Sequence, residues 1–185
     1  MIAKPLLQAL VPLVDDLSRE LPDSERYRRL LEAMQALLPC DAVALLTLDG
    51  DGLVPLAVNG LSRDTLGRRF RIDEHPRFAL LLAAGGPLRI PADSPLPDPY
   101  DGLVEGVQGQ LEVHDCMGCP VQVGEKTWGL LTLDALDKER LSKVDLRDVQ
   151  AFASLAAATV SVVQRIKGLA LRAEDERQRA DTYRA

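Results

Sequence analysis

Six side chains in the second half of the sequence have the chemistry to bind a metal ion or to take part in redox reactions. They are Asp98, Asp101, His114, Cys116, Cys119 and Asp134. The whole chain contains only two histidines and three cysteines, and one histidine and two cysteines fall between residues 114 and 119. This clustering directs attention to a metal site, a dithiol pair, or an ordinary loop followed by an ordinary strand.

The imidazole and the thiols lie on a predicted strand at residues 114–123. Residues two apart on a strand point to the same face, so His114 and Cys116 are expected to reach one site while Cys119 faces the other way. The C-x-x-C spacing also permits a redox pair, although that motif usually opens a helix. A disulfide between the two cysteines would destroy a metal site that uses Cys116.

The three carboxylates come from two other segments. Asp98 and Asp101 flank a Pro-Tyr pair in a long polar loop, where a single helical turn would bring both to one side. Asp134 ends the apolar strand predicted at residues 127–134, which places it at the rim of the sheet. All three aspartates also have a plain structural interpretation as turn formers, just as Cys116 could be a small buried hydrophobe.

The mixed set of ligands restricts the choice of metal without fixing it. Structural zinc prefers cysteine and histidine in a closed tetrahedron. Magnesium and calcium prefer oxygen ligands alone. Histidine and carboxylate around open coordination positions suit non-haem iron(II).

The elements that must position these side chains follow from hydrophobic periodicity and from turn residues. We expect helices at 6–17, 24–38 and 73–86, strands at 40–48, 53–59, 88–91, 114–123 and 127–134, and a long helix from Ser142. This order indicates an α+β domain with an antiparallel central sheet flanked by helices. We divide the chain into a folded domain, 1–141, and a C-terminal helix with linker, 142–185.

The composition excludes several classes of function. A net charge of −6 argues against a nucleic-acid surface, which needs a dense basic stripe. No run is judged apolar and long enough to span a bilayer. Three cysteines are too few for a secreted disulfide framework, so we expect a cytoplasmic protein.

The C-terminal helix has apolar or neutral residues alternating three and four apart, as in a coiled-coil seam. They are Val149, Phe152, Ala156, Thr159, Val163, Ile166 and Ala170. We therefore expect a homodimer joined through this helix. The helix continues into a charged tail, which suggests a linker toward a further module, and the sequence contains no Walker-type phosphate loop.

Four runs of the sequence resemble the N-terminal GAF domain of NorR-type regulators, which are nitric-oxide-responsive activators that work with sigma-54 RNA polymerase. They are HPR (75–77), PADSPLPDPYDGL (91–103), HDCMGCP (114–120) and WGLLTLDAL (128–136). The run LPDPYDGL is the most specific of them. The resemblance follows the chain in order over nearly its whole length.

The resemblance implies a mononuclear non-haem iron(II) centre that binds nitric oxide. Its candidate ligands fall on Asp98, Asp101, His114, Cys116 and Asp134. Arg77 and Tyr100 are implied to lie beside them in the pocket, where the guanidinium of Arg77 could hold a ligating carboxylate in place. Nitric oxide is then expected to relieve the inhibition that the domain exerts on an adjoining AAA+ ATPase, so the chain would be a sensor and not an enzyme.

Three alternatives remain open at the level of sequence. Some GAF domains reduce free methionine sulfoxide, and Cys116 with Asp134 and Asp101 could imitate their active site. A second alternative is a GAF domain that binds a cyclic nucleotide or another small organic ligand, although aromatic residues make up only 4% of the chain. The third is a dimerisation module with a vestigial site.

Overall fold

The structure is a computed structural model that describes residues 4–107 and 115–183. The helices are α1 (Lys4–Asp16), α2 (Asp23–Leu37), α3 (Pro76–Ala83) and α4 (Leu146–Thr182). The strands are β1 (Ala42–Asp49), β2 (Gly52–Asn59), β3 (Phe70–Arg71), β4 (Leu88–Ile90), β5 (Asp115–Val123) and β6 (Lys126–Ala135). Three short 3-10 turns, η1 (Arg63–Gly67), η2 (Ile72–Glu74) and η3 (Arg140–Lys143), complete the described elements.

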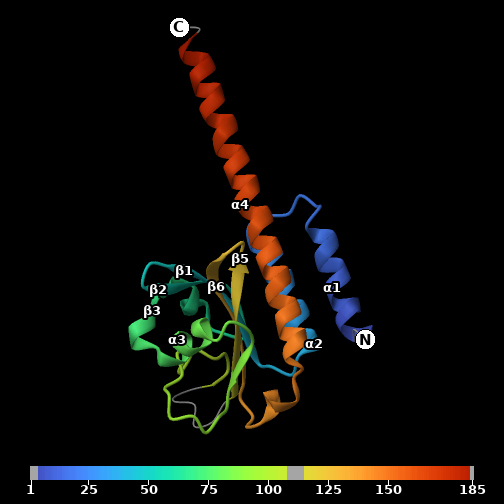
Figure 1. Ribbon diagram of the computed structural model, residues 1–185, viewed down its shortest axis with the longest axis vertical. Helices are drawn as coiled ribbons and strands as arrows, with labels where there is room; N and C mark the ends of the chain where they lie inside the picture. The colour runs from blue at the N-terminus through green and yellow to red at the C-terminus, as the bar shows by residue number, and fades with distance from the viewer. Residues whose placement is uncertain (1–3, 108–114, 184–185) are drawn as a thin grey trace.

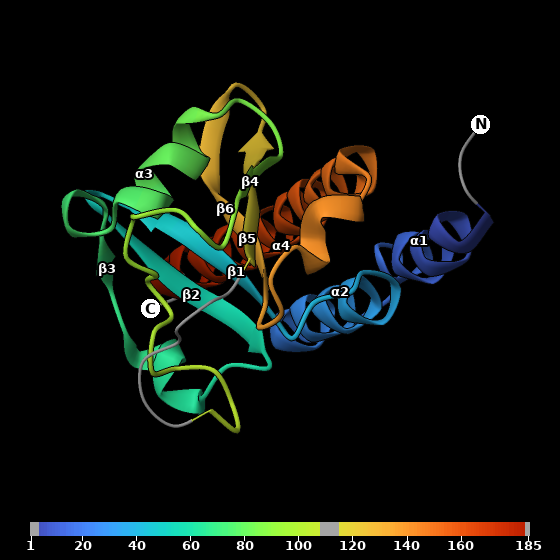
Figure 2. The ribbon, with the colours of Figure 1, turned by 90° about the horizontal axis from the view of Figure 1, so that it is seen from below.

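The strands form one sheet in the order β3-β2-β1-β6-β5-β4, and each described neighbouring pair is antiparallel. Helices α1, α2 and α4 lie on one face of the sheet, whereas α3 and the loop that follows β4 lie on the other (Figures 1 and 2). The predicted α+β architecture with an antiparallel sheet flanked by helices is therefore confirmed.

Each face of the sheet has its own apolar core. The helix-side core lies under α2 and α4 and includes Leu45, Leu131 and Phe152. The pocket-side core lies under α3 and the long loop and includes Leu46 and Leu130. Adjacent leucines of β1 and β6 thus enter different cores, as the alternation of side chains along a strand requires.

Helix α3 can approach the sheet closely because β5 has a glycine beneath it. A Cβ atom at Gly118 would lie 2.7 Å from Cδ1 of Leu81, a residue of α3 that is fully buried. Pro76 occupies the first turn of α3, where its missing N–H costs nothing. The close contact fixes α3 over β5 and thereby sets the position of Arg77, the second residue of the helix.

Helix α4 begins four residues later than expected. Asp145, and not Ser142, is the N-cap, and its carboxylate accepts a hydrogen bond from the Arg147 amide at 2.9 Å. Ser142 belongs to η3 instead. The capping aspartate and the 3-10 turn before it together place the root of α4 beside the start of β5.

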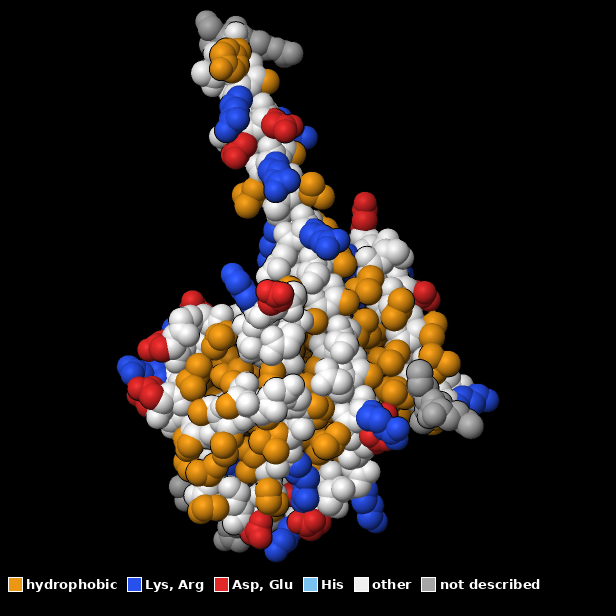
Figure 3. Space-filling model, viewed as in Figure 1, with side chains coloured by type: hydrophobic (Ala, Val, Ile, Leu, Met, Phe, Trp, Pro, Cys, Tyr) orange, Lys and Arg blue, Asp and Glu red, His pale blue; other side chains and the backbone are white. Residues whose placement is uncertain are grey.

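The first half of α4 packs on the sheet and its second half projects beyond the body (Figure 1). The projecting part carries charged side chains of both signs between apolar ones (Figure 3). An 18-residue window of α4 has a mean hydropathy of 1.3, which by length and composition would suffice to cross a membrane, so the sequence-based exclusion of such a run is too strong. Of that window, 44% is buried inside the fold, where the first half of α4 packs on the sheet.

Candidate metal centre

Cys116 and Asp134 are direct neighbours across the β5–β6 pair. Their Cα atoms are register partners, so both side chains point to the same face of the sheet. That face carries the pocket-side core, and the two residues are 1% and 4% exposed. The structure therefore brings together a thiol and a carboxylate that are 18 residues apart in sequence.

The long loop contributes Asp98, which is held from α3. Nη1 of Arg77 lies 3.2 Å from Oδ2 of Asp98, and both side chains are 4% exposed. Nε of Arg77 also donates to the Leu96 carbonyl at 2.9 Å, and Oδ1 of Asp98 accepts from the Tyr100 amide at 2.6 Å. The pairing of Arg77 with a candidate carboxylate ligand agrees with the role implied for it by the resemblance.

Tyr100 links the same loop to the floor of the sheet. Its hydroxyl is 2.9 Å from Oγ1 of Thr132, a buried residue of β6 that lies two positions before Asp134 on the same face. The Tyr100 ring meets Phe78 of α3 and Phe70 of β3 edge to face, with centroids 5.6 and 5.9 Å apart. The loop is thus anchored by an aromatic cluster as well as by an ion pair.

Asp134 is the most unusual group of this pocket. Among residues 4–107 and 115–183, neither of its buried carboxylate oxygens has a hydrogen-bond partner in good geometry, although the Cys116 thiol is near enough to act as a weak donor. Desolvation, and next the nearby charge of Asp98, raise the pKa of Asp134 well above its ordinary value, while Cys116 and Arg77 act in the opposite direction. A buried carboxylate in this situation either holds a proton or faces a cation that the protein chain does not supply.

The thiol of Cys116 is also kept protonated. Burial, followed by the charges of Asp134 and Asp98, raises its pKa well above the usual value for a thiol. Reactive cysteines need a partly exposed, electropositive setting that lowers the pKa. The surroundings of Cys116 thus oppose its use as the nucleophile of a reductase, whereas a bound cation would reverse the effect and favour the thiolate.

Asp101 differs from Asp98. The two residues share a turn in which the Asp101 amide donates to the Asp98 carbonyl at 3.3 Å, but Asp101 is exposed whereas the Asp98 side chain is buried. His114 lies outside the described residues. The ligand roles assigned to Asp101 and His114 therefore stay predictions.

Cys119 faces the helix-side core, as the strand alternation predicts. Its Sγ lies 3.7 Å from Oε1 of Gln150 on α4, and burial raises its pKa to about 11. Cys116 belongs to the opposite core, and both cysteines are free. The disulfide considered between them is therefore wrong for the folded protein, because the sheet itself separates the two sulfur atoms.

The described residues do not form a complete metal site by themselves. Within the described ranges, no group of three or more His, Cys, Asp or Glu side chains is placed to hold a metal ion. Cys116 and Asp134 converge, and Asp98 is close enough to influence the pKa of both. The chemistry of this set fits a cation.

Two polar residues near this pocket were missed by the sequence argument. Thr132 is the hydroxyl partner of Tyr100. Its position two residues before Asp134 on the same strand could have indicated that both side chains lie on one face of the sheet. Asp115, which lies between two of the candidate ligands in sequence, was assigned no role. Its side chain is fully buried, and its Oδ1 lies 3.0 Å from Nη2 of Arg89 on β4. No local sequence pattern encodes this ion pair, because its two partners come from distant segments.

Known proteins resemble the chain in both sequence and structure. Residues 24–160 match the family model of the GAF domain. The chain is 43% identical over 156 residues to the regulatory protein LuxO of Vibrio cholerae. Over 168 residues it is 42% identical to the anaerobic nitric oxide reductase transcription regulator NorR of Serratia proteamaculans. The resemblance inferred from sequence motifs is thereby confirmed.

These matches cover most of the chain but only part of each relative. The match to LuxO includes 84% of the chain and 29% of that relative, and the match to NorR of Serratia proteamaculans includes 89% and 33%. The chain thus spans about a third of the length of these relatives. Among solved structures, the free methionine-R-sulfoxide reductase of Neisseria meningitidis superposes with a TM-score of 0.68 at 13% identity, covering 90% of this chain and 95% of that one. At this identity the likeness concerns the fold alone.

Proposed function

Because the chain belongs to the GAF domain family, we propose that it is a nitric-oxide-sensing input module that holds a mononuclear non-haem iron(II) in the pocket between β5, β6 and the long loop. The named NorR relatives support the signal, and their names as transcription regulators support a sensor that is not an enzyme. LuxO, at similar identity, is named only as a regulatory protein, so the relatives alone do not decide the signal.

The observation that carries the proposal is the buried carboxylate of Asp134, which lacks a hydrogen-bond partner within the described part of the chain. Removing a carboxylate from water costs several kcal/mol unless it is paired or neutralised. The nearby charge of Asp98 makes the cost larger, and Cys116 would add a third negative charge if its thiol lost its proton. One divalent cation would compensate all three groups at once.

The proposed ligands are Asp98, His114, Cys116 and Asp134, with Asp101 as a further candidate on the loop. Ferrous iron held by such a set would supply an open coordination position for nitric oxide. The protein contributes the enclosure: Arg77 orients the Asp98 carboxylate, and Tyr100 closes the loop onto Thr132. The strand ligands are held by the sheet ladder, so the loop is the part of the site best able to move.

The proposed output element is α4, which leads from the sheet toward the further module. In a sigma-54 activator this module would be an AAA+ ATPase that the sensor keeps inactive until nitric oxide binds. The same proposal includes a homodimer joined through α4, a cytoplasmic location, no direct nucleic-acid contact by this chain, and the division at residues 141 and 142.

Anaerobic loading with ferrous iron tests the proposal. We expect one iron per chain and, on addition of nitric oxide, the electron paramagnetic resonance signal that ferrous iron acquires when it binds this ligand. Asp134→Asn should abolish both, whereas Cys119→Ala, a change on the opposite face of β5, should leave both intact. A native protein that retains no iron under these conditions would falsify the proposal.

A further inference from the structure

We propose that Asp115 couples the candidate metal pocket to the root of α4, and that it does so by holding the base of the long loop with one carboxylate oxygen and the entry to α4 with the other. The proposal deepens the proposed function, because it assigns the route by which a change in the pocket reaches the output helix. It rests on a group that plays no part in metal binding.

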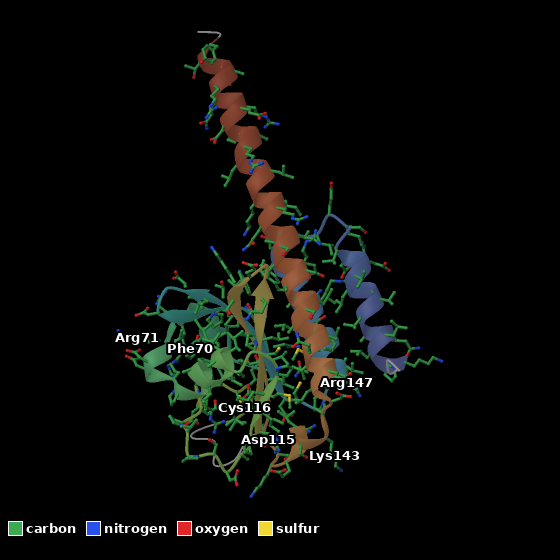
Figure 4. The ribbon with its side chains drawn as sticks, in the orientation of Figure 1. Phe70, Arg71, Asp115, Cys116, Lys143 and Arg147 are labelled. Atoms are coloured by element: carbon green, nitrogen blue, oxygen red, sulfur yellow. The ribbon has the colours of Figure 1, made fainter. Side chains whose placement is uncertain are left out.

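Asp115 is adjacent to Cys116 and points to the opposite face of β5. Its Cα pairs with Ala135 of β6, one position beyond the Cys116–Asp134 pair. Figure 4 shows Asp115 and Cys116 together at the start of β5, near the base of α4 where Lys143 and Arg147 lie. A displacement of Cys116 along or across the strand therefore moves Asp115 with it, because neighbouring residues share one peptide unit.

Both oxygens of the Asp115 carboxylate are engaged, and they serve different segments. Oδ1 accepts from the amide of Ala92 at 3.1 Å, at the base of the loop that carries Asp98. Oδ2 accepts from the amide of Leu141 at 3.1 Å, inside η3, which leads into α4. Nη2 of Arg89 lies 3.0 and 3.1 Å from the two oxygens and bridges them.

The contacts are buried, which makes them sensitive to small shifts. Asp115 and Leu141 are both fully buried, so neither can exchange its partner for bulk water without opening the fold. Arg89 also pairs with Glu139 at 2.9 Å. Glu139 is the one described non-glycine residue with a positive φ, +63°, so the turn before α4 is held in a backbone conformation that is costly for a side chain of this type.

The arrangement has two inputs and one output. The loop base at Ala92 and the strand residue Cys116 both connect to the pocket, and the Leu141 amide connects to α4. A shift of the loop changes the contact of the Ala92 amide with Oδ1, and a shift of the strand moves the Asp115 backbone. In both cases the Asp115 carboxylate moves, and its Oδ2 carries the change to the Leu141 amide in η3. Asp115 is thus a positioning residue for the output helix, and its removal should uncouple α4 without emptying the pocket.

A double-substitution cycle tests this coupling without any metal. The pocket is perturbed by Cys116→Ala, and backbone amide hydrogen exchange is followed over residues 139–150. We expect Cys116→Ala to change exchange in this segment at least about threefold in the native background, and not at all in the Asp115→Asn background. Asparagine keeps the shape of Asp115 but offers one acceptor oxygen in place of two.

The matched control is Asp41→Asn. The Asp41 carboxylate also holds the connection from β6 to η3, through the Leu136 amide at 2.8 Å and Arg140 at 3.1 Å, but it approaches from β1. It should speed local exchange while leaving the response to Cys116→Ala unchanged. Arg89→Gln, which leaves both amide contacts of Asp115 in place, should weaken the response partially and serves if Asp115→Asn folds poorly.

The outcomes separate this inference from the proposed function. An equal response to Cys116→Ala in the native and Asp115→Asn backgrounds, or no response in the native one, overturns the role of Asp115. In iron-loaded protein, nitric oxide should change exchange over 139–150 only where Asp115 is present, while the paramagnetic signal persists in Asp115→Asn. A missing paramagnetic signal in the native protein overturns the iron proposal alone, because the metal-free cycle still decides the coupling.

Discussion

The two thiols of β5 lie three residues apart, yet they belong to different environments. Cys119 enters the helix-side core among apolar side chains of the helices, where burial alone raises its pKa. Cys116 enters the pocket-side core, where two aspartates add to the effect of burial. On one face of the sheet a thiol is therefore buried among apolar side chains, and on the other a thiol is buried beside two carboxylates at a cost in stability.

This contrast separates residues that hold the fold together from residues that bind a ligand. A packing face tolerates loss of a side chain at the expense of stability alone. A binding face should show changes in ligand affinity that are out of proportion to changes in stability. Substitutions on the two faces therefore test whether the pocket-side face is a site.

The largest effect is expected from Asp134→Asn. Removal of an outer-shell partner typically costs 10–100-fold in metal affinity, and loss of a proposed ligand should exceed this, leaving no detectable iron at equimolar concentrations. Iron content after anaerobic desalting is the measurement. Full occupancy in this variant would mean that the buried carboxylate serves another purpose.

The same variant should change the pH dependence of the metal-free protein. The folded pKa of Asp134 is raised, so the folded state binds its proton more tightly than the unfolded state. Stability is then greatest below the unfolded pKa of about 3.9, and falls by up to about 1.4 kcal/mol per pH unit as the pH rises toward the folded pKa. Asp134→Asn should flatten this decline in urea titrations between pH 4 and 8. An unchanged slope would contradict the assignment.

A large loss of stability is expected from Arg77→Gln. Breaking a buried ion pair from one side removes the contact of Arg77 with Asp98 and costs about 3–5 kcal/mol. Phe152→Ala, on the helix-side face, should cost a similar 3–5 kcal/mol. The two variants should differ in the amount of iron retained per folded molecule. We expect this amount to fall in Arg77→Gln and to stay unchanged in Phe152→Ala. Equal retention in both would remove the distinction between the faces.

The two cysteines provide a smaller and more closely matched comparison. We expect Cys116→Ala to lower iron affinity at least about tenfold, and Cys119→Ala to leave it within twofold, at a similar loss of about 1 kcal/mol in stability for each. Competition with a chelator measures the affinity. If Cys119→Ala lowered the iron affinity more than Cys116→Ala, the iron site would lie on the helix-side face of the sheet and the proposal would be wrong.

Tyr100→Phe should have the smallest effect. The change removes one hydrogen bond to Thr132, which is worth about 1 kcal/mol, and it preserves the aromatic contacts with Phe70 and Phe78. Thermal unfolding should register the loss while iron occupancy stays unchanged. A loss of iron would show that the hydroxyl does more than fasten the loop.

The sequence predicted the structure correctly where the periodicity of neighbouring residues determines which way each side chain points. Strand alternation assigned Cys116 and Cys119 to opposite faces, and apolar periodicity located the helices and most of the sheet. Chain order alone did not pair Cys116 with Asp134 as register partners, since registers depend on contacts across the whole sheet. The strand at 70–71 is too short to leave a periodic signal.

Local patterns also failed for contacts between distant segments. Nothing near Arg89 in sequence indicates its partner Asp115, which lies 26 residues away. The loop aspartates looked equivalent, yet only the Asp98 side chain is buried, because Arg77 of α3 reaches it. The start of α4 shifted since Asp145 competes with Ser142 as a cap, and capping residues locate helix ends only to within a turn.

Helix α4 has a mechanical consequence. Its 37 residues span roughly 55 Å at 1.5 Å per residue, and its last buried side chain is Val163, so about half of this length extends beyond the core, with an ion pair from Lys167 to Asp23 near its start. A tilt of about 5° at Leu146 would carry the far end through roughly 5 Å by simple leverage. Small adjustments at the base would thereby reach the far end of the helix as a displacement comparable to one helical turn.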